Sequence, residues 1–265
     1  MITKIAQISD THLSKKNPLF DGNFPPVAEA LRAARPDLVI HTGDLSLDGA
    51  DCAEDLEHGV AAMRTLGLDW LAVPGNHDVG DDPALAGKQP VTAERLARWE
   101  SCVGPRHFVR DIPGWRLIGL DTQGFGLESI IEALTTAGAR RVAFFQHKPI
   151  TEETLADRAV NYWPLLPPRR AELLALCRPA VIASGHVHEW RDRVADGIRQ
   201  VWAPAIGFIV GDPWKHPVGD KVLGWVEHAF HADGTHTAEL RAMPELPLHD
   251  LGSIPEAYGP LPRLG

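Results

Sequence analysis

Short apolar runs recur along the chain, and each is followed by a small polar cluster. The runs cover residues 5–8, 38–40, 70–73, 142–145 and 180–183. Short, near-continuous apolar runs are typical of strands that are covered on both faces of a sheet. The clusters that follow them are Asp10-Thr11-His12, Gly43-Asp44, Gly75-Asn76-His77-Asp78, His147 and Gly185-His186-Val187-His188. Because such strand-end loops gather at the carboxyl edge of a sheet, we expect these side chains to converge on one pocket.

Helical patterns alternate with the apolar runs. They cover residues 26–35, 52–66, 92–102, 127–137 and 168–177. Three tight turns between strand-like segments, at Pro113-Gly114, Asp196-Gly197 and Asp233-Gly234, predict β-hairpins. The succession is βαβα at first and richer in strands later, which predicts an α/β (α+β mixed) fold.

The polar clusters contain seven side chains with metal-binding donor atoms. A catalytic zinc site uses three protein ligands and a water, so seven donors are too many for one ion. Seven donors with one bridging carboxylate fill two adjacent sites. Nitrogen and oxygen donors without cysteine suit Mn, Fe, Zn or Co better than Ca or Mg. The seven are the carboxylates of Asp10 and Asp44, the amide of Asn76, and the imidazoles of His12, His147, His186 and His188.

Each cluster also has an ordinary structural explanation when it is taken alone. Asp-x-His, Gly-Asp and Gly-Asn-His-Asp are all typical of turns at strand ends. His186 and His188 indicate more, since side chains at i and i+2 of an extended segment point the same way and can reach neighbouring metals. The order of all five clusters at strand ends favours the metal site over five unrelated turns.

The series Asp-x-His, Gly-Asp, Gly-Asn-His-Asp, His, Gly-His-x-His resembles the calcineurin-like metallophosphoesterase superfamily, over about residues 2–205. Within it, Ser9-Asp10-Thr11-His12-Leu13 and Thr42-Gly43-Asp44-Leu45 look like the bacterial cyclic-nucleotide and glycerophosphodiester phosphodiesterase branch. The resemblance implies a four-layer αββα sandwich, in which two mixed β-sheets are flanked by helices.

The resemblance also implies a role for each residue of the motifs. Asp44 would bridge the two metal ions, and His77 would face the substrate as a general acid or transition-state donor without binding metal. Asp78 would orient or polarise His77, since a neighbouring carboxylate raises the basicity of an imidazole. The first metal would be held by Asp10, His12 and His188, and the second by Asn76, His147 and His186.

These residues predict a phosphodiesterase mechanism. Two adjacent cations lower the pKa of a bridging water, so a metal-bridging hydroxide would attack phosphorus while His77 assists the leaving group. The expected substrates are small phosphodiesters of cyclic-nucleotide or glycerophosphodiester type. A phosphomonoesterase or a phosphonate-related phosphatase would use the same metal site. A non-catalytic scaffold protein would be expected to have lost ligands, and all seven are present.

Two segments depart from the pattern of related enzymes. After His147 the chain continues with Lys148-Pro149, where relatives often carry a second histidine. Lys148 could place a cation near the phosphoryl group as a substrate-binding residue, or it could be a solvated loop lysine. After residue 127 the start of the expected helix is intact, but its packing residues differ from those of relatives.

Residues 204–222 form a candidate specificity rim. Trp214 and His216 could select the alcohol groups of a diester, or the segment could be a packed loop with aromatic anchors. We expect residues 1–242, which include this rim, to form the catalytic domain. The Pro- and Gly-rich tail, residues 243–265, is expected to wrap the surface or to serve a subunit contact in a homo-oligomer.

Composition narrows the class of partner. The formal net charge of −9 argues against a large nucleic-acid footprint and leaves a small phosphoester as the expected partner. The first strand begins almost at once and no long apolar segment follows, so neither export nor membrane insertion is expected. The three scattered cysteines fit reduced thiols and a cytoplasmic protein.

Overall fold

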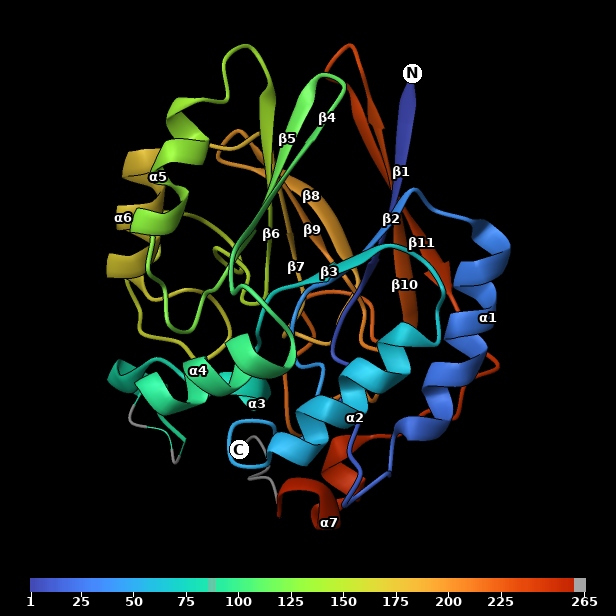
Figure 1. Ribbon diagram of the computed structural model, residues 1–265. Helices are drawn as coiled ribbons and strands as arrows, with labels where there is room; N and C mark the ends of the chain where they lie inside the picture. The colour runs from blue at the N-terminus through green and yellow to red at the C-terminus, as the bar shows by residue number, and fades with distance from the viewer. Residues whose placement is uncertain (86, 88, 260–265) are drawn as a thin grey trace.

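The computed structural model describes residues 1–85, 87 and 89–259, and these form two mixed β-sheets that lie face to face (Figure 1). The strand order is β11-β10-β1-β2-β3 in the first sheet and β4-β5-β6-β7-β9-β8 in the second. The strands are β1 Ile2–Ile8, β2 Leu38–His41, β3 Trp70–Ala72, β4 Phe108–Ile112, β5 Trp115–Leu120, β6 Arg141–Gln146, β7 Val181–Ser184, β8 Arg191–Ala195, β9 Ile198–Trp202, β10 Gly224–His231 and β11 His236–Ala242.

Strand direction follows the connections between strands. Strands β1, β2 and β3 are mutually parallel, as are β5, β6, β7 and β9. The pairs β4-β5, β8-β9 and β10-β11 are antiparallel, which confirms the three hairpins predicted from their turns. The central strands of both sheets therefore have their carboxyl ends at one end of the sandwich, where α3, α4 and α7 lie in Figure 1.

Five of the helices agree with the sequence-based prediction to within two residues at each end: α1, α2, α4, α5 and α6. The sequence indicated only a turn at Gly75–Asp78, where the four-residue α3 begins. A helix this short carries no periodic apolar pattern, so only its turn chemistry was visible. The helices are α1 Phe24–Ala34, α2 Ala53–Arg64, α3 Asn76–Val79, α4 Ala93–Cys102, α5 Glu128–Thr135, α6 Pro167–Leu176 and α7 Pro255–Tyr258, with 3-10 turns at Asp21–Asn23, Pro83–Leu85 and Leu251–Ser253.

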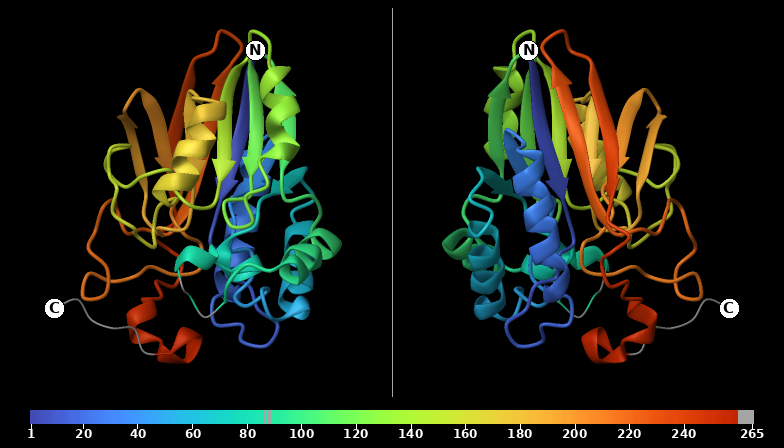
Figure 2. Two further views of the ribbon diagram at one scale, coloured as in Figure 1. Left: turned by 90° about the vertical axis from the view of Figure 1, so that its left-hand side faces the viewer. Right: turned by 90° about the vertical axis from the view of Figure 1, so that its right-hand side faces the viewer.

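Helices cover the outer face of each sheet. Figures 1 and 2 show α1 and α2 beside the first sheet, with α5 and α6 beside the second. Leu31 of α1 and Met63 of α2 pack into one buried cluster with Ile8 of β1. Ile130 of α5 and Leu173 of α6 pack into another with strands of the second sheet. These layers confirm the αββα sandwich.

The space between the sheets is filled by large apolar side chains from both of them. Ile5 and Phe230 of the first sheet meet Trp115 and Phe145 of the second, and all four are fully buried. The rings of Trp115 and Phe230 pack edge to face, with centroids 5.0 Å apart. This arrangement fixes the two sheets against each other through close packing.

A polar bridge also joins the sheets, directly behind two of the polar clusters. The side-chain amide of Gln7 in β1 donates to Thr42 Oγ1 at 3.0 Å and to the carbonyl of Ser184 in β7 at 3.1 Å. His228 donates from Nε2 to Gln7 Oε1 at 2.9 Å and accepts at Nδ1 from His236. Burial lowers the pKa of both imidazoles, that of His236 to about 3, so this bridge is held by neutral rings.

The described part of the tail, residues 243–259, lies against the rest of the chain. Met243 and Leu246 are buried in the same cluster as α1 and α2. The wrapping course that the sequence suggested is consistent with these contacts, while the domain division at residue 242 and a subunit contact stay predictions. Among the described residues, we find no helix with the length and apolarity that a membrane crossing needs.

We expect Phe230→Ala to lower the free energy of unfolding by about 3–5 kcal/mol, because it opens a cavity between two packed sheets. Chemical denaturation monitored by circular dichroism measures the change. Val194→Ala, at a side chain that is 71% exposed, is the control and should stay within about 0.5 kcal/mol of the unmodified protein. A loss of less than about 1 kcal/mol for Phe230→Ala would contradict the role given to the inter-sheet core.

Candidate metal centre

The five polar clusters converge at the carboxyl end of the sandwich, as the sequence predicted. They follow β1, β2, β3, β6 and β7. The candidate ligands form two groups, and within each the ligand atoms lie within 4.8 Å of one another. Asp44 belongs to both groups, which is the arrangement that a bridging carboxylate requires. One group is Asp10, His12, Asp44 and His188, and the other is Asp44, His147 and His186.

The backbone at these strand ends adopts left-handed conformations. Positive φ angles occur at Asp10 (53°), His12 (48°), Asp44 (53°), His186 (68°) and His188 (59°). Such angles are uncommon for residues other than glycine, and they cluster at functional sites because they turn side chains in directions that an extended strand cannot. Five of the seven candidate ligands thus depend on this local geometry.

Two glycines allow the loops to approach one another closely. A Cβ atom at Gly75 would lie 2.1 Å from Asp44 Oδ1, and one at Gly185 would lie 1.9 Å from Ser9 Oγ. No larger residue fits at either position without moving a neighbouring loop. These glycines therefore bring the loops after β3 and β7 against those after β2 and β1.

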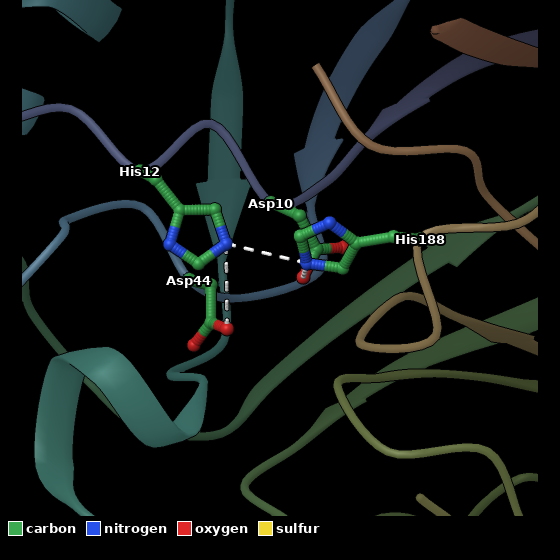
Figure 3. A group of neighbouring side chains, drawn as sticks. All are labelled: Asp10, His12, Asp44 and His188. Atoms are coloured by element: carbon green, nitrogen blue, oxygen red, sulfur yellow. Dashed lines mark hydrogen bonds and ion pairs between the residues drawn. The ribbon is translucent and has the colours of Figure 1, made fainter. Parts of the chain in front are cut away.

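The first group surrounds a point between His12, His188 and two carboxylates. Figure 3 shows these side chains arriving from the loops after β1, β2 and β7. His12 Nε2 lies 3.3 Å from His188 Nε2 and 3.7 Å from Asp44 Oδ2, and His188 Nε2 lies 3.2 Å from Asp10 Oδ1. Two carboxylates and two imidazoles with their donor atoms this close form a set that suits a transition-metal ion.

The second group surrounds His147. Its Nε2 lies 3.0 Å from Asn76 Oδ1 and 3.4 Å from Asp44 Oδ2. The amide nitrogen of Asn76 donates to the hydroxyl of Tyr162 at 3.2 Å, which directs the amide oxygen toward His147. The amide oxygen of Asn76 therefore lies beside the second group, and its role as a metal ligand stays a prediction.

Backbone carbonyls fix which nitrogen each imidazole presents to the site. His147 Nδ1 donates to Thr42 O at 2.8 Å, and His188 Nδ1 donates to Phe208 O at 2.7 Å, so that Nε2 of each ring is the nitrogen that faces the site. His186 Nε2 donates to Tyr162 O at 3.4 Å, so Nδ1 is its ligand atom. Hydrogen bonds of this kind select the tautomer and orient the ring of a metal-binding histidine.

Electrostatics keep the carboxylates ionised despite burial. Burial alone would raise the pKa of Asp44, but His147 and His77 beside it hold that pKa well below its usual range. The Asp44 charge and hydrogen bond overcome the effect of burial on His147 and raise its pKa to about 9. Burial and then neighbouring cationic groups lower the pKa of His12 and of His186. Metal binding would therefore displace a proton chiefly from His147.

His77 lies beside this centre but outside both groups of ligands. Its Nδ1 donates to the carbonyl of Leu47 at 3.1 Å, and its Nε2 lies 4.0 Å from Asp44 Oδ2. The side chain is partly exposed and lines a cavity that reaches the metal ligands. His77 therefore lines the cavity without joining either ligand group, and its roles in facing a substrate and as an acid stay predictions.

Asp78 requires a correction. We expected it to orient His77, but its carboxylate accepts instead from the backbone N–H groups of Leu45, Ser46 and Gly75 and from the Ser46 hydroxyl. Burial, and then the charge of Asp44, raise the pKa of Asp78 to about 6. A carboxylate placed in this way joins the loop after β2 to the start of α3. The carbonyl of Leu47, rather than Asp78, is the group that orients the His77 ring.

Lys148 is buried, which excludes the solvated alternative. Its Nζ donates to Asp81 Oδ1 at 2.8 Å and to Tyr162 O at 3.0 Å, and it lies 4.6 Å from the centre of the Tyr162 ring. Tyr162 O also accepts from His186. Lys148 therefore supports the loop that carries Tyr162, and direct contact with a phosphoryl group stays a prediction.

The remaining predicted substrate residues have different positions. Trp214 lines the cavity beside the metal ligands, whereas His216 is exposed and is not among the described residues that line it. The structure adds Tyr162 and Trp163, which sequence reasoning missed. An adjacent pair of large aromatic residues in an otherwise polar stretch was the available signal.

His41 is a buried supporting residue that the sequence did not single out. It accepts at Nδ1 from Gly43 N–H at 3.2 Å and donates from Nε2 to Thr11 Oγ1 at 3.0 Å. The Thr11 hydroxyl donates in turn to the carbonyl of Leu45 at 2.9 Å. This chain holds the loop before Asp44 in place. His41 is the last residue of β2, and the sequence there contains no motif that would have identified it.

Two named proteins are similar in sequence to this chain over most of its length. The chain is 27% identical over 263 residues to the 3',5'-cyclic adenosine monophosphate phosphodiesterase CpdA of Escherichia coli, covering 91% of this chain and 90% of that protein. It is 26% identical over 211 residues to a probable glycerophosphodiester phosphodiesterase GpdQ of Arcobacter nitrofigilis, covering 69% and 71%.

A solved structure supports the fold, and a family model identifies the family. A dimetal phosphatase from Danio rerio superposes with a TM-score of 0.61 at 13% identity, covering 91% of this chain and 96% of that one, which supports the fold alone. Residues 3–190, which contain all seven candidate ligands, match the calcineurin-like phosphoesterase family model. The chain therefore belongs to the calcineurin-like phosphoesterase family and is a metal-dependent phosphoester hydrolase.

Proposed function

We propose that this enzyme is a dinuclear-metal phosphodiesterase that hydrolyses small phosphodiesters of cyclic-nucleotide or glycerophosphodiester type. The observation that carries the proposal is the position of Asp44, a buried carboxylate common to two groups of ligands at the floor of a cavity. The names of the relatives at 27% and 26% identity support a diester substrate. The net charge of −9 favours a small substrate over a nucleic acid.

The donor set fits two ions. Asp10, His12 and His188 would hold one, Asn76, His147 and His186 would hold the other, and Asp44 would bridge them. Such a pair lowers the pKa of a shared water to near neutrality and neutralises charge on the phosphoryl oxygens. The absence of cysteine among the donors and the mixture of nitrogen and oxygen favour Mn, Fe, Zn or Co.

His77 would supply the proton to the leaving alcohol. Its Nδ1–H is engaged by Leu47 O, so the protonated ring presents Nε2–H toward Asp44 and the cavity. A donor held in this position can protonate an alkoxide as the bond to phosphorus breaks. Asp78 would contribute indirectly, because it fixes the turn from Gly75 into α3 on which His77 stands.

The substrate class is tested by parallel turnover of matched esters. We expect metal-reconstituted protein to hydrolyse bis-p-nitrophenyl phosphate with a higher kcat/KM than p-nitrophenyl phosphate, and to act on 3',5'-cyclic nucleotides or glycerophosphodiesters. Both synthetic esters release the same phenolate, so the comparison isolates the second alcohol. A preference for the monoester by about tenfold or more would overturn the proposal in favour of a phosphomonoesterase.

We expect Asp44→Ala to disrupt both metal positions, since one carboxylate serves both groups. The metal content should fall to below about one ion per chain, with kcat/KM reduced by at least about 100-fold. Elemental analysis after gel filtration measures the first quantity. Asp69→Ala, at an exposed carboxylate, is the matched control and should retain metal and activity. Retention of two ions by Asp44→Ala would rule out the bridge.

We expect His77→Ala to retain its metals and to lose turnover. General acid catalysis typically contributes about 10²–10⁴-fold, and the loss should be greater for alkyl esters than for p-nitrophenyl esters, whose leaving group needs no proton. Steady-state kinetics with both kinds of ester, together with elemental analysis, separate chemistry from metal binding. His231→Ala serves as the control histidine variant. Loss of metal from His77→Ala would show that the ring is a ligand instead.

A further inference from the structure

The cavity beside the metal centre has an apolar, aromatic wall. Its volume is about 340 Å³, and its lining includes His77 and three candidate metal ligands, Asp44, His186 and His188. The remaining lining is almost free of polar side chains, which is unexpected for a site that binds a charged ester. These lining residues are Tyr162, Trp163, Phe208, Val210, Trp214 and Leu251.

The C-terminal segment, residues 249–252, completes this wall. Ile209 N–H donates to His249 O, and Leu251 N–H donates back to Ile209 O, both at 2.9 Å. Asp250 accepts from Gly211 N–H at 3.0 Å. These bonds attach the segment to the candidate rim, and they place the buried Leu251 side chain against the cavity. A segment that the sequence marked as a surface tail is thus part of the site.

Gly252 fixes the position of the Trp214 ring. A Cβ atom at Gly252 would lie 2.1 Å from an atom of the indole, so the ring packs directly on the glycine backbone. The backbone N–H of Trp214 donates to the carbonyl of Gly211 at 3.0 Å. The N–H of the same Gly211 donates to the Asp250 carboxylate. The indole is therefore placed by two segments that are far apart in sequence, and it forms part of the cavity lining.

A buried ion pair supports another part of the cavity lining. Lys215 pairs with Glu189, which follows His188, and its Nζ lies 5.0 Å from the centre of the Trp163 ring. The ring of Trp163 in turn packs on that of His186, with the two ring centroids 5.5 Å apart. A cation above an indole and a buried carboxylate beside it restrict the movement of the wall.

Phe208 connects the wall to the metal ligands. Its ring centroid lies 4.5 Å from that of His12 and 4.4 Å from that of His188. Its carbonyl accepts from His188 Nδ1. The apolar wall therefore reaches the ligands themselves, so a group that is joined to a bound phosphoryl would lie against it.

A second cavity that also includes His77 has a more polar lining. Its volume is about 300 Å³, and its lining includes Ser14, Lys16, Asn17 and Asp48. The aromatic lining is thus confined to one side of the site. A substrate that bridges His77 would meet aromatic rings on one side and polar groups on the other.

We propose, on the basis of the phosphodiesterase function above, that the aromatic cavity binds an apolar, planar alcohol group of the diester. Stacking on indole and phenyl rings favours a planar group, and its burial removes apolar surface from water. A glycerol-like group in the same place would set its hydroxyls against a lining that is mostly apolar among the described residues, which disfavours its binding. Trp214 and Leu251 are then specificity-determining residues, and Gly252 positions Trp214.

The test compares two phosphonates as ligands of the metal-loaded protein by isothermal titration calorimetry. Phenylphosphonate and methylphosphonate carry the same metal-binding group and differ only in the group joined to phosphorus. We expect phenylphosphonate to bind at least about tenfold more tightly. In Trp214→Leu and in Gly252→Ala this ratio should fall by about threefold or more, with the Kd of methylphosphonate unchanged.

Leu248→Ala, at a side chain that is 62% exposed in the same C-terminal segment, is the matched control and should keep the ratio. Equal affinity for the two phosphonates, or an unchanged ratio in both variants, overturns the proposal. The Kd of methylphosphonate reports on an intact metal site, so a variant that misfolds is recognised. The binding measurement does not depend on turnover, so it separates the two proposals. Tighter binding of phenylphosphonate by a protein that hydrolyses no diester would refute the proposed function and would still support the assignment of the cavity.

Discussion

The site depends on one constraint, which is that the Asp44 carboxylate must stay ionised where water is excluded. Burying a charge is unfavourable unless it is paired, and the imidazoles of His147 and His77 supply that pairing before any metal is bound. The left-handed backbone at Asp44 and the missing Cβ at Gly75 both serve to bring this carboxylate within reach of them. The unusual local geometry at Asp44 and Gly75 is therefore explained by one shared ligand.

The same constraint explains why the two sheets are joined by polar as well as apolar contacts. Close packing of Trp115 and Phe230 sets the spacing of the two sheets. Gln7 adds a polar contact between them, because its amide donates to Thr42 Oγ1 and to Ser184 O, which stand directly before the ligand loops after β2 and β7. Packing and this hydrogen-bonded bridge together hold the ligand loops of the two sheets in register.

The sequence predicted the layers and the convergence of the ligands, because strand-end motifs and hairpin turns are local signals. It did not predict contacts that depend on distant segments. The sequence left Lys148 open between a phosphoryl contact and a solvated loop position, because its partner Asp81 is distant in the chain. It indicated His77 as the partner of Asp78, whose partners are backbone groups of Leu45 and Ser46. Spacing along the chain indicates which residues lie at the same edge of a sheet, but it does not indicate which groups form hydrogen bonds with one another.

Substrate selection follows from the same division between local and distant contacts. The metal ligands stand on strand ends whose position the sheets fix. The aromatic wall is carried by loops and by residues 249–252, which are joined to one another by hydrogen bonds. Changes in the residues of that wall leave the bridge at Gln7 and the Thr42 carbonyl that orients His147 in place. The fold can therefore alter which alcohol group it accepts without altering the chemistry at phosphorus, which is why no motif marks the specificity of this chain.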